Sequence, residues 1–388
     1  MTEAVAAGRT AVVAHPDSAL TARGELALQS LVGLVEAGWR VVLALRSPGP
    51  LGEAARAAGA DVAVLDFSAL RTASGPASAV AEALSEPGAA GRPIADLLRR
   101  VRPDVVYVTS ARLPLWIVHA RLLRLPVVVH VHDPEGAASR RVRGAIARTI
   151  GADGVVVVGS EASRAGLLGA APGLADRAVV VHSSCVHPPL IRPARERLEG
   201  RLHLLAAGDD QAGLAVAVNA LGLLLGRGLD VDLEVRCGSG HEPDRWTALR
   251  ARADVLGLGD RVAFHALEAE SWEAIADADM VLLPSGAHGS RTDIAVQALV
   301  SGRPVAVSET GSVTETITGF ASAIPVPPGD APALAAAVER VATTWTAFRR
   351  MAAATAPMAM RQYSAVAYRR AMVSELTRAA RSAERRAS

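Results

Sequence analysis

Lysine is missing from this chain of 388 residues, so all 41 side chains of the lysine and arginine class are arginine. Without lysine there is no side-chain amine to form a Schiff base, to act as a nucleophile or to bind a phosphate group. Aromatic residues are scarce, at 3% of the chain, and they do not alternate with basic residues in a stripe. Because proteins bind nucleic acids through such basic and aromatic surfaces, we expect no nucleic-acid partner.

Cysteine is also rare. Cys185 and Cys237 fall in different halves of the chain and have no metal-binding spacing. The N-terminus carries no charged segment followed by an apolar one, which, with so little cysteine, predicts a reducing, cytoplasmic location. No apolar run approaches the roughly 18 residues that a membrane span requires. We therefore expect any membrane contact to be peripheral, at the inner face of the membrane.

Short apolar runs are the pattern that is present. Half of the residues are apolar and 21% are charged, which is typical of a folded chain, and the length suits two domains with one core each. Val-rich runs alternate with helix-period stretches, which predicts parallel, doubly wound sheets covered by helices. The expected strands lie at residues 10–14, 41–45, 61–65, 105–108, 127–131, 155–158 and 179–181 in the first half, and at residues 202–206, 232–235, 261–264, 280–283, 305–308 and 323–326 in the second. A stretch rich in Ala, Ser, Gly and Pro, residues 72–93, is expected to be a surface excursion.

Proline-rich segments divide the chain. Pro188-Pro189 and the charged run at residues 195–201 predict a linker between two Rossmann-like domains. A long helical tail is expected over residues 331–380, with a break near Pro357. The expected domains cover residues 1–190 and 191–365, with a cleft between them, and a C-terminal helix over residues 366–388 returns to the first domain.

The loop that joins the expected strand at residues 280–283 to the next helix predicts a ligand site. Thr292 or Asp293 can cap that helix. In a β–loop–α unit this loop lies at the carboxyl edge of the sheet, where open α/β folds bind ligands, and the helix start offers free N–H groups to an anion. Arg291, His288 and the Thr292 amide are therefore candidate diphosphate ligands. The alternative is a solvated loop with a surface histidine.

Several motifs in the second half resemble those of the family-4 glycosyltransferases, which have the GT-B fold. Residues 256–264 (LGLGDRVAF) resemble the family's LGL-x-DRV-x-F, residues 276–285 (ADADMVLLPS) its ADxxxLPS, residues 302–315 (GRPVAVSETGSVTE) its GxPVVxTxxGGxxE, and residues 326–335 (VPPGDAPALA) its VPPGDxxxLA. The resemblance covers residues 200–370, whereas the first half resembles the family by topology and a few positions.

The resemblance implies an α/β protein of the GT-B type that moves a sugar from a nucleotide diphospho-sugar to an acceptor hydroxyl. It implies retention of configuration, a donor held by the second domain, and no catalytic metal or other cofactor. The acceptor across the cleft, whether a glycan, a lipid-linked glycan or a small molecule, is not named by the sequence.

The family's donor-site residues are replaced in this chain. Its two glutamates, which contact the donor sugar and the ribose, correspond to Gly289 and Gln297, and Gln297 can still bond a ribose hydroxyl. Its arginine and lysine near the first strand of this domain correspond to an acidic loop with Asp209 and Asp210. Two carboxylates facing a diphosphate repel it by roughly a few kcal/mol at intermediate dielectric. These losses keep open an alternative, in which the chain is a catalytically inactive partner or scaffold for an active glycosyltransferase.

Further candidates follow other strands. Arg236, just before Gly238, is a second candidate for the donor diphosphate. Arg23 and Gly24 stand where the family has a glycine-rich turn near the donor phosphate and the acceptor. The alternative for Gly24 is an ordinary turn glycine.

A histidine pair ends the expected strand at residues 127–131. His130 and His132 point to the same face of a strand, and His132 matches a family position that contacts the donor sugar. Asp133 and Glu135 follow and can orient an acceptor hydroxyl, so His132 and Glu135 are the catalytic candidates. The alternative is a structural turn with the histidine packed at the sheet edge.

Two remaining patterns have simpler interpretations. The motifs Asp230-Val231-Asp232 and Asp277-Ala278-Asp279 have the Asp-x-Asp form of metal-binding glycosyltransferases of another fold, and we expect neither to bind a metal. Basic amphipathic helices can rest on anionic lipid, although a solvated helix face is the alternative that we favour. Their arginines are Arg121, Arg124, Arg140, Arg141, Arg143 and Arg148.

Overall fold

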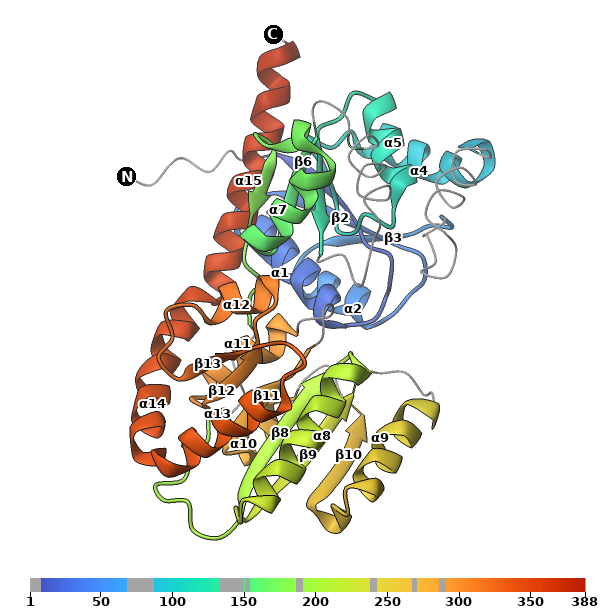
Figure 1. Ribbon diagram of the computed structural model, residues 1–388. Coiled ribbons are helices and arrows are strands. Elements are labelled where there is room, and N and C mark those ends of the chain that lie inside the picture. The colour runs from blue at the N-terminus through green and yellow to red at the C-terminus, as the bar shows by residue number, and fades with distance from the viewer. Residues whose placement is uncertain are drawn as a thin grey trace. The chain divides into compact units, whose positions relative to one another are not determined.

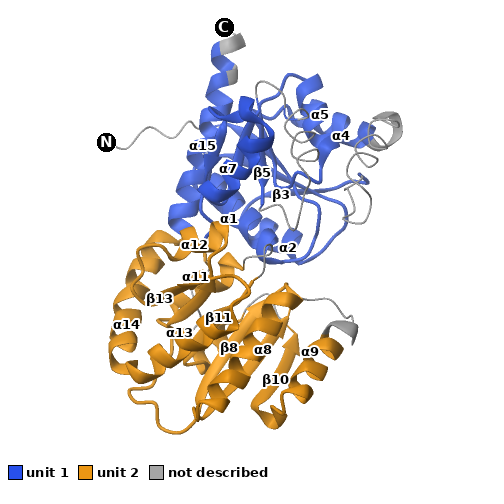
Figure 2. Cartoon of the chain, in the orientation of Figure 1, with its two compact units in different colours: residues 1–184, 365–388 blue, residues 185–364 orange. Residues whose placement is uncertain are grey.

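A computed structural model shows the protein as two compact units (Figures 1 and 2). Unit 1 contains residues 1–184 and 365–388, and unit 2 contains residues 185–364. The structure describes residues 8–67, 87–132, 150, 154–185, 191–237, 243–266, 271–285 and 291–387. Because unit 1 is built from both ends of the chain, the C-terminal helix belongs to the N-terminal sheet.

Unit 1 has a seven-stranded sheet in the order β3-β2-β1-β4-β5-β6-β7, and all its pairings are parallel. The strands are β1 (Thr10–Ala14), β2 (Arg40–Leu45), β3 (Asp61–Val64), β4 (Val105–Val108), β5 (Val127–Val131), β6 (Val155–Val158) and β7 (Ala178–Val180). Neighbouring residues of one strand enter different cores: Val12 and Ala14 pack in one cluster, and Ala11 and Val13 in the other. This alternation is the period of a strand whose two faces are both covered by helices.

Helices cover the two faces of this sheet. They are α1 (Ala22–Glu36), α2 (Pro50–Ala57), α4 (Pro87–Val101), α5 (Pro114–Leu122), α7 (Glu161–Ala170) and α15 (Ala365–Ala387). The C-terminal helix α15 lies along α1 (Figure 1). Its buried residues Tyr368, Met372, Leu376 and Ala379 recur at helical spacing and enter the core on that face. The start of α4 at Pro87 places the end of the expected excursion, residues 87–93, in a helix.

Unit 2 repeats the arrangement with six parallel strands in the order β10-β9-β8-β11-β12-β13. The strands are β8 (Leu202–Gly208), β9 (Val231–Cys237), β10 (Val262–Ala266), β11 (Met280–Leu283), β12 (Val305–Ser308) and β13 (Ala323–Val326), and the helices are α8 (Gln211–Gly226), α9 (Pro243–Val255), α10 (Trp272–Asp277), α11 (Thr292–Val300), α12 (Gly311–Ile317), α13 (Ala331–Thr343) and α14 (Trp345–Gln362). Two doubly wound parallel sheets were predicted, and both are confirmed. Residues of β8 and β11 again alternate between two cores, one against α8 and α13 and the other against α10, α11 and α12.

The expected helix break near Pro357 is wrong. Pro357 lies inside α14, which runs on to Gln362. A proline inside a helix removes one hydrogen bond, but the buried face of α14, with Ala352 and Ala356, packs against α11 and keeps the helix continuous. The break comes instead after Gln362, where the backbone N–H of Cys185 donates to the carbonyl of Tyr363 at 2.8 Å.

The described part of the predicted linker, residues 191–201, is anchored to unit 2. Arg303, which is only 2% exposed, donates from Nη2 to the carbonyl of Arg192 at 3.0 Å. Arg195 donates from Nε to the buried carboxylate of Asp279 at 2.7 Å, and Trp345 Nε1 donates to the carbonyl of Arg195 at 3.0 Å. These contacts make the segment part of the folded unit.

Over the residues that the structure describes, no helix has both the length and the hydropathy that crossing a bilayer requires.

Candidate functional site

The central strands of both sheets end where a ligand site is expected. The strand order reverses between β1 and β4 in unit 1, and between β8 and β11 in unit 2. Open α/β sheets bind ligands at this switch point, outside the carboxyl ends of the strands. The residues that follow β1, β4 and β5, and those that follow β8 and β11, therefore form the two candidate edges.

The edge of unit 2 is held by contacts between strand ends. The backbone N–H of Ser285, after β11, donates to Ser308 Oγ at the end of β12 at 3.0 Å, and Ser285 Oγ lies 3.2 Å from Thr310 Oγ1. On the other side, Gly213 of α8 packs against the carbonyl of Pro284, and a Cβ at Gly213 would lie 2.3 Å from that oxygen. The loop ends are thus packed so closely that residue 213 must lack a side chain.

Arg291, a predicted diphosphate ligand, is already paired within the protein. Its Nε and Nη2 donate to the two carboxylate oxygens of Asp293 at 2.9 and 2.7 Å, and its Nη1 lies 3.5 Å from Asp209 Oδ2. Burial acts to lower the pKa of Arg291, but the hydrogen bonds and charges of the two aspartates outweigh burial and raise the pKa. The side chain is 18% exposed, so it remains within reach of a ligand, although its charge is compensated.

Helix α11 begins differently from the prediction. Thr292 is its first residue and Arg291 stands at the N-cap, without a capping bond from its side chain. Asp293, one of the two expected caps, binds Arg291 instead, and Thr292 is likewise not the cap. The expected capping was wrong because a two-bond guanidinium–carboxylate pair is stronger than a single capping bond.

The two aspartates of the loop after β8 interact with neighbouring groups of unit 2. Asp209 faces Arg291, as described above, and Asp210 caps α8 by accepting from the backbone N–H of Ala212 at 3.0 Å. Among the described residues between β8 and α8 and between β11 and the first turn of α11, the side chains carry three carboxylates, Asp209, Asp210 and Asp293, and one guanidinium, that of Arg291. The residues that would meet a diphosphate here have a negative sum of charges.

Gln297 has the feature expected of a ligand contact. It lies in the second turn of α11 and is 8% exposed, and its Oε1 is buried without a hydrogen-bond partner among the described residues. A buried acceptor left unpaired costs about 1–3 kcal/mol. A hydroxyl group of a ligand that donated to this oxygen would recover that energy.

The other predicted donor-side residues divide into two groups. Arg236, on β9, forms an ion pair with Glu234 of the same strand, so its charge is also compensated. Gly238, His288 and Gly289 lie outside the described residues.

The edge of unit 1 carries three histidines. His15 follows β1, while His130 and His132 are two residues apart at the end of β5, and the rings of this pair stack with centroids 4.1 Å apart. His132 Nε2 lies 3.0 Å from the carbonyl oxygen of Thr109, after β4, and His15 Nδ1 lies 2.7 Å from Thr109 Oγ1. Sequence reasoning singled out His132 but missed His15 and Thr109. Their positions directly after β1 and β4 were the available signal, because carboxyl ends of parallel strands share one edge.

Burial keeps these histidines uncharged at neutral pH. Desolvation lowers the pKa of His15 to about 4 and that of His130 to about 4. The pKa of His132 is also lowered well below its ordinary value, by burial first and then by His130, Arg23 and His15. The three rings therefore act as hydrogen-bonding groups.

The start of α1 lies beside these histidines. Thr21 caps the helix by accepting from the backbone N–H of Gly24 at 3.3 Å, and a Cβ on Gly24 would lie 2.5 Å from the carbonyl oxygen of Ala19. Close packing against the Ala19 carbonyl therefore explains why residue 24 is a glycine. The charge of Arg23 acts on His15 and on His132, which places it at the same edge. Asp133 and Glu135 lie outside the described residues.

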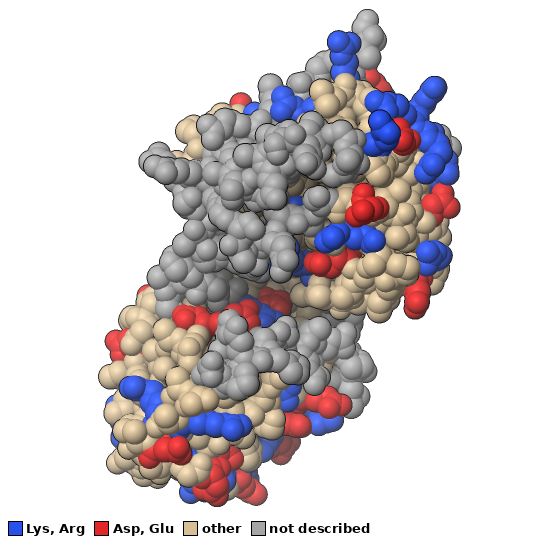
Figure 3. All heavy atoms as spheres, turned by 90° about the vertical axis from the view of Figure 1, so that its right-hand side faces the viewer, with Lys and Arg blue, Asp and Glu red and all other residues tan. Residues whose placement is uncertain are grey.

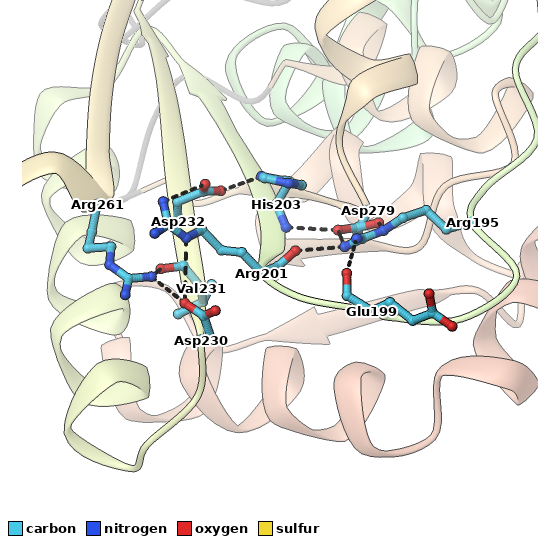
Figure 4. A network of polar contacts seen from close by, with 9 residues as sticks. All are labelled: Arg195, Glu199, Arg201, His203, Asp230, Val231, Asp232, Arg261 and Asp279. Carbon is cyan, nitrogen blue, oxygen red and sulfur yellow. Dashed lines mark hydrogen bonds and ion pairs between the residues drawn. The ribbon is translucent and has the colours of Figure 1, made fainter.

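The aspartates of the two Asp-x-Asp motifs pair with arginines and a histidine near the amino ends of the strands of unit 2, and Figure 4 shows Asp230, Asp232 and Asp279 with their partners. The pairs are Asp230 with Arg201 and Arg261, Asp232 with Arg201 and His203, Asp277 with Arg192, and Asp279 with Arg195. This edge is opposite to the ligand edge. In the described ranges no group of three His, Cys, Asp or Glu residues is arranged to hold a metal ion.

Arginines also gather on the surface of unit 1, in its upper part in Figure 3. Arg121 and Arg124 are exposed at the end of α5, and Leu122 between them is 73% exposed. The arginines at residues 140–148 lie outside the described residues. Contact of these helices with a membrane stays a prediction.

Two family models match the chain, one on each sheet. The model "Glycosyl transferase 4-like domain" matches residues 25–184, and the model "Glycosyl transferases group 1" matches residues 200–344. A search of the curated proteins finds no match.

Solved structures share the fold at low sequence identity. HepE from Anabaena, in complex with UDP and glucose, has a TM-score of 0.74 and 16% identity over 95% of this chain and 99% of that chain. A glycosyltransferase from Rickettsia africae has a TM-score of 0.73 and 13% identity, covering 96% and 98%. Sucrose-phosphate synthase from Thermosynechococcus elongatus has a TM-score of 0.68 and 17% identity, covering 94% and 98%. The likeness extends over nearly the whole length of each chain.

Proposed function

This chain belongs to the GT-B glycosyltransferases of the family-4 type, and from that membership we propose that it moves a sugar from a nucleotide diphospho-sugar to an acceptor hydroxyl with retention of configuration. HepE is described in complex with UDP and glucose and in complex with UDP-glucose. A uridine nucleotide is therefore the first donor to test.

The unpaired Oε1 of Gln297 carries the proposal. By the resemblance of the motifs, Gln297 of α11 corresponds to the position with which the family binds the ribose, and its Oε1 is buried without a partner in the described part of the chain. Ribose hydroxyl groups are hydrogen-bond donors that fit a carbonyl oxygen. The ribose would then lie beside α11, with the diphosphate toward the helix start.

The diphosphate would be held by the first free N–H groups of α11, at Thr292 and Asp293, and by Arg291. The contact of Arg291 with Asp209, at 3.5 Å, is longer than its two bonds to Asp293. It is the contact that a phosphate oxygen would most easily replace. Positive charge and helix-start N–H groups stabilise the departing diphosphate, so the proposed step needs no metal ion. The contributions of His288, Gly289, Arg236 and Gly238 stay predictions.

On unit 1, His132 would contact the donor sugar, and Arg23, Asp133 and Glu135 would face the acceptor. His132 is neutral, because its pKa is lowered. It therefore suits a hydrogen bond to a sugar hydroxyl better than an ion pair with phosphate. Exclusion of water from the reacting groups would favour transfer to the acceptor over hydrolysis.

Calorimetric titration of the full chain with UDP, GDP and dTDP tests the proposal. We expect one of them to bind with a Kd below millimolar, and Gln297→Met to weaken that binding. Incubation with the matching nucleotide-sugar should release sugar slowly to water, and NMR of the first sugar released should show the anomeric configuration of the donor. No binding of any of the three nucleotides at millimolar concentration would remove the enzymatic proposal.

One observation favours a second candidate function. The ion pairs with Asp293 and Asp209 neutralise the charge of Arg291. The reaction would need that positive charge to bind the diphosphate. A chain that had become a partner or scaffold for an active glycosyltransferase would keep such pairs, because they stabilise the loop. This alternative predicts that the nucleotides do not bind and that the chain forms a stable complex with an active enzyme of the same fold, measured by co-purification of the two tagged proteins.

A further inference from the structure

Helices α4 and α5 of unit 1 are followed by arginines in an uncommon backbone conformation. Arg102 comes directly after α4 with a φ of 48°, and Arg124 follows Leu123 at the end of α5 with a φ of 57°. In the described part of the chain, these two are the only residues other than glycine with a positive φ. A side chain in this left-handed region is unfavourable, because its Cβ atom comes close to the following carbonyl oxygen. Both arginines therefore lower the stability of the fold.

Other helices of the protein are followed by glycine in the same conformation. The φ angles of these glycines lie between 63° and 91°, and the residues are Gly38, Gly59, Gly228, Gly257, Gly302 and Gly319, which follow α1, α2, α8, α9, α11 and α12. Glycine has no Cβ atom and adopts this region readily. Arginine after α4 and α5 is thus less favourable than the residue that the same fold uses elsewhere. A role outside the fold would explain its presence.

The two arginines lie at the same edge of one sheet. Helix α4 leads into β4 and α5 leads into β5, and these strands are neighbours in which Val106 pairs with Val127. The two helices also pack against each other (Figure 1). Because each arginine comes shortly before its strand, both lie at the amino edge of the sheet, opposite to the histidines.

The ends of both helices are basic. Arg99 and Arg100 lie in the last turn of α4, and Arg121 lies in the last turn of α5. They are exposed, as are Arg102 and Arg124, and these five residues are called the amino-edge arginines below. Cations in the last turn of a helix already complement its dipole. The dipole therefore does not account for the further arginines in the left-handed conformation.

Few carboxylates compensate this charge. Residues 96–126 contain two, and Asp96 forms an ion pair with Arg99, while Asp104 accepts from the backbone N–H of Thr10 at 2.7 Å. Arg100, Arg102 and Arg124 have no ion-pair or hydrogen-bond partner among the described residues. Five guanidinium groups against two carboxylates leave this segment with an excess of positive charge.

The amino edge of unit 2 shows the contrasting use of arginine. There Arg195 binds the buried carboxylate of Asp279, and Arg261 forms an ion pair with Asp230 (Figure 4). Those guanidinium groups are paired within the fold. The unpaired amino-edge arginines of unit 1 are instead available to an anionic surface outside the protein.

An exposed apolar side chain lies between these charges. Leu122 is the last residue of α5 and is 73% exposed, and within residues 96–126 no other large hydrophobic residue that the structure describes is as open to solvent. A single leucine does not form the apolar centre that a protein–protein interface requires. A leucine surrounded by arginines fits a lipid surface, where the guanidinium groups meet anionic headgroups and the leucine enters the acyl boundary.

We propose that the amino-edge arginines and Leu122 form a docking surface for an anionic lipid membrane. The amphipathic pattern of α5 alone favoured a solvated helix face. The conformation of Arg102 and Arg124 and their lack of partners in the described residues favour the membrane instead. The ligand edge of unit 1 is at the other end of the strands, so docking leaves that edge open to solution. The proposal is independent of the proposed glycosyl transfer.

Sedimentation of the full chain with vesicles tests the proposal. We expect binding to vesicles of phosphatidylcholine with about one third phosphatidylglycerol, and not to vesicles of phosphatidylcholine alone. Binding should weaken as salt is raised, because salt screens the arginines. A wild-type chain that stays in solution with the anionic vesicles at low salt would overturn the proposal.

The double variant Arg102→Gly/Arg124→Gly separates docking from a structural role. Glycine suits the positive φ at both positions, so the temperature of unfolding should stay the same or rise. The affinity for anionic vesicles should fall by about ten- to thirtyfold, because each arginine near the surface contributes roughly a factor of five. Leu122→Gln keeps all five charges, and it should weaken binding by about fivefold or more while retaining the dependence on salt.

Arg197→Gln/Arg350→Gln is the matched control. These arginines of unit 2 are also exposed and have no partner among the described residues, so the net charge changes by the same amount. Their loss should alter vesicle binding less than about twofold. Equal losses in the control and in the glycine variant would show that only net charge matters, and would overturn the assigned surface. Should the glycine variant not fold, Leu122→Gln and Arg99→Gln/Arg100→Gln decide, and unchanged binding in both would overturn the proposal.

Discussion

At the carboxyl edge of unit 1, two of three uncharged histidines, His15 and His130, each have a buried ring nitrogen without a hydrogen-bond partner among the described residues, whereas at the equivalent edge of unit 2 an arginine is already paired with two aspartates. Both edges stand on sheets that reverse strand order at the same place. The difference therefore comes from the few residues that follow the strands. The fold determines where a ligand meets each unit, and these residues determine which charges and hydrogen bonds it meets.

The contrast has a consequence for the donor. A sugar is uncharged and rich in hydroxyl groups, which suits the lone pairs of unit 1. A diphosphate carries negative charge, which suits unit 2 only if Arg291 exchanges one carboxylate for a phosphate. The sugar-facing half of the proposed reaction is thus prepared in the free protein, and the phosphate-facing half requires an exchange of partners.

Acidification should produce the largest effect, on the histidine side of the comparison. The unfolded chain takes up protons on His15 and His130 below pH 6.5, but the folded chain does so only near the lowered pKa of about 4. Stability that is fully present above pH 6.5 is therefore lost as the pH falls toward 4. At pH 5 the loss is about 2 kcal/mol for each histidine. Urea unfolding at pH 7.5 and pH 5, followed by hydrogen exchange in peptides of each unit, measures it.

Unit 2 and one variant are the controls for this prediction. Peptides of unit 2 should lose less stability than those of unit 1 over the same pH range. His15→Asn keeps a donor for Thr109 but cannot titrate, so it should remove the share of His15 from the pH dependence. An unchanged pH dependence in this variant would show that His15 is not a source of it.

The next largest effect on stability is expected from a substitution in the closely packed edge of unit 2. Gly213→Ala places a Cβ 2.3 Å from the carbonyl oxygen of Pro284, and overpacking of this kind costs about 1–3 kcal/mol. Gly226→Ala, at the end of the same helix, meets nothing within 4 Å, and should be neutral or slightly stabilising. Thermal unfolding of the two variants compares them directly. Equal stabilities would mean that the loop after β11 yields easily, and that the edge is not rigid.

The sequence was sufficient to predict the sheets, because strands buried on both faces are short Val-rich runs between helix-period stretches. It was not sufficient for Pro357, because the continuity of α14 depends on packing against α11. A local rule about proline contains no information on such a contact. The predicted cap of α11 was wrong for a similar reason. Arg291 binds Asp293 and also Asp209, which is distant in the sequence.

For the candidate site, the predicted strands were sufficient to place residues at the carboxyl edges of the two sheets, but not to find their partners across those edges. The position of His132 after a strand could be read directly, and the same rule applied to every strand would have found His15 and Thr109. The hydrogen bond between Ser30 and Tyr368 could not be found in this way, because the two residues are 338 positions apart in the sequence. Their hydrogen bond exists only because α15 packs along α1.

The variant Gln297→Met tests the role proposed for the side-chain amide at the edge of unit 2. Methionine has a similar shape but removes the unpaired Oε1, so the free protein should become more stable by about 1 kcal/mol. Binding of UDP should weaken by about tenfold, because the hydrogen bond to the ribose is lost. Thermal unfolding and calorimetry measure the two changes. Loss of stability in the variant would indicate that Oε1 has a partner within the protein.

The smallest expected effect concerns the pairing of Arg291. In Asp209→Asn the carboxylate facing Nη1 is replaced by an amide, which leaves that nitrogen freer to meet a phosphate. The pair is partly exposed, and exposed pairs contribute about 0.2–1 kcal/mol, so the affinity for UDP should rise by a factor of about 2–5. Asp210→Asn makes the same change of charge one residue away and retains a good cap for α8, but it does not touch Arg291. Calorimetry should therefore show tighter binding in the first variant than in the second. Equal gains would mean that only the summed charge of the loop matters, and that Asp209 does not compete with phosphate for the guanidinium.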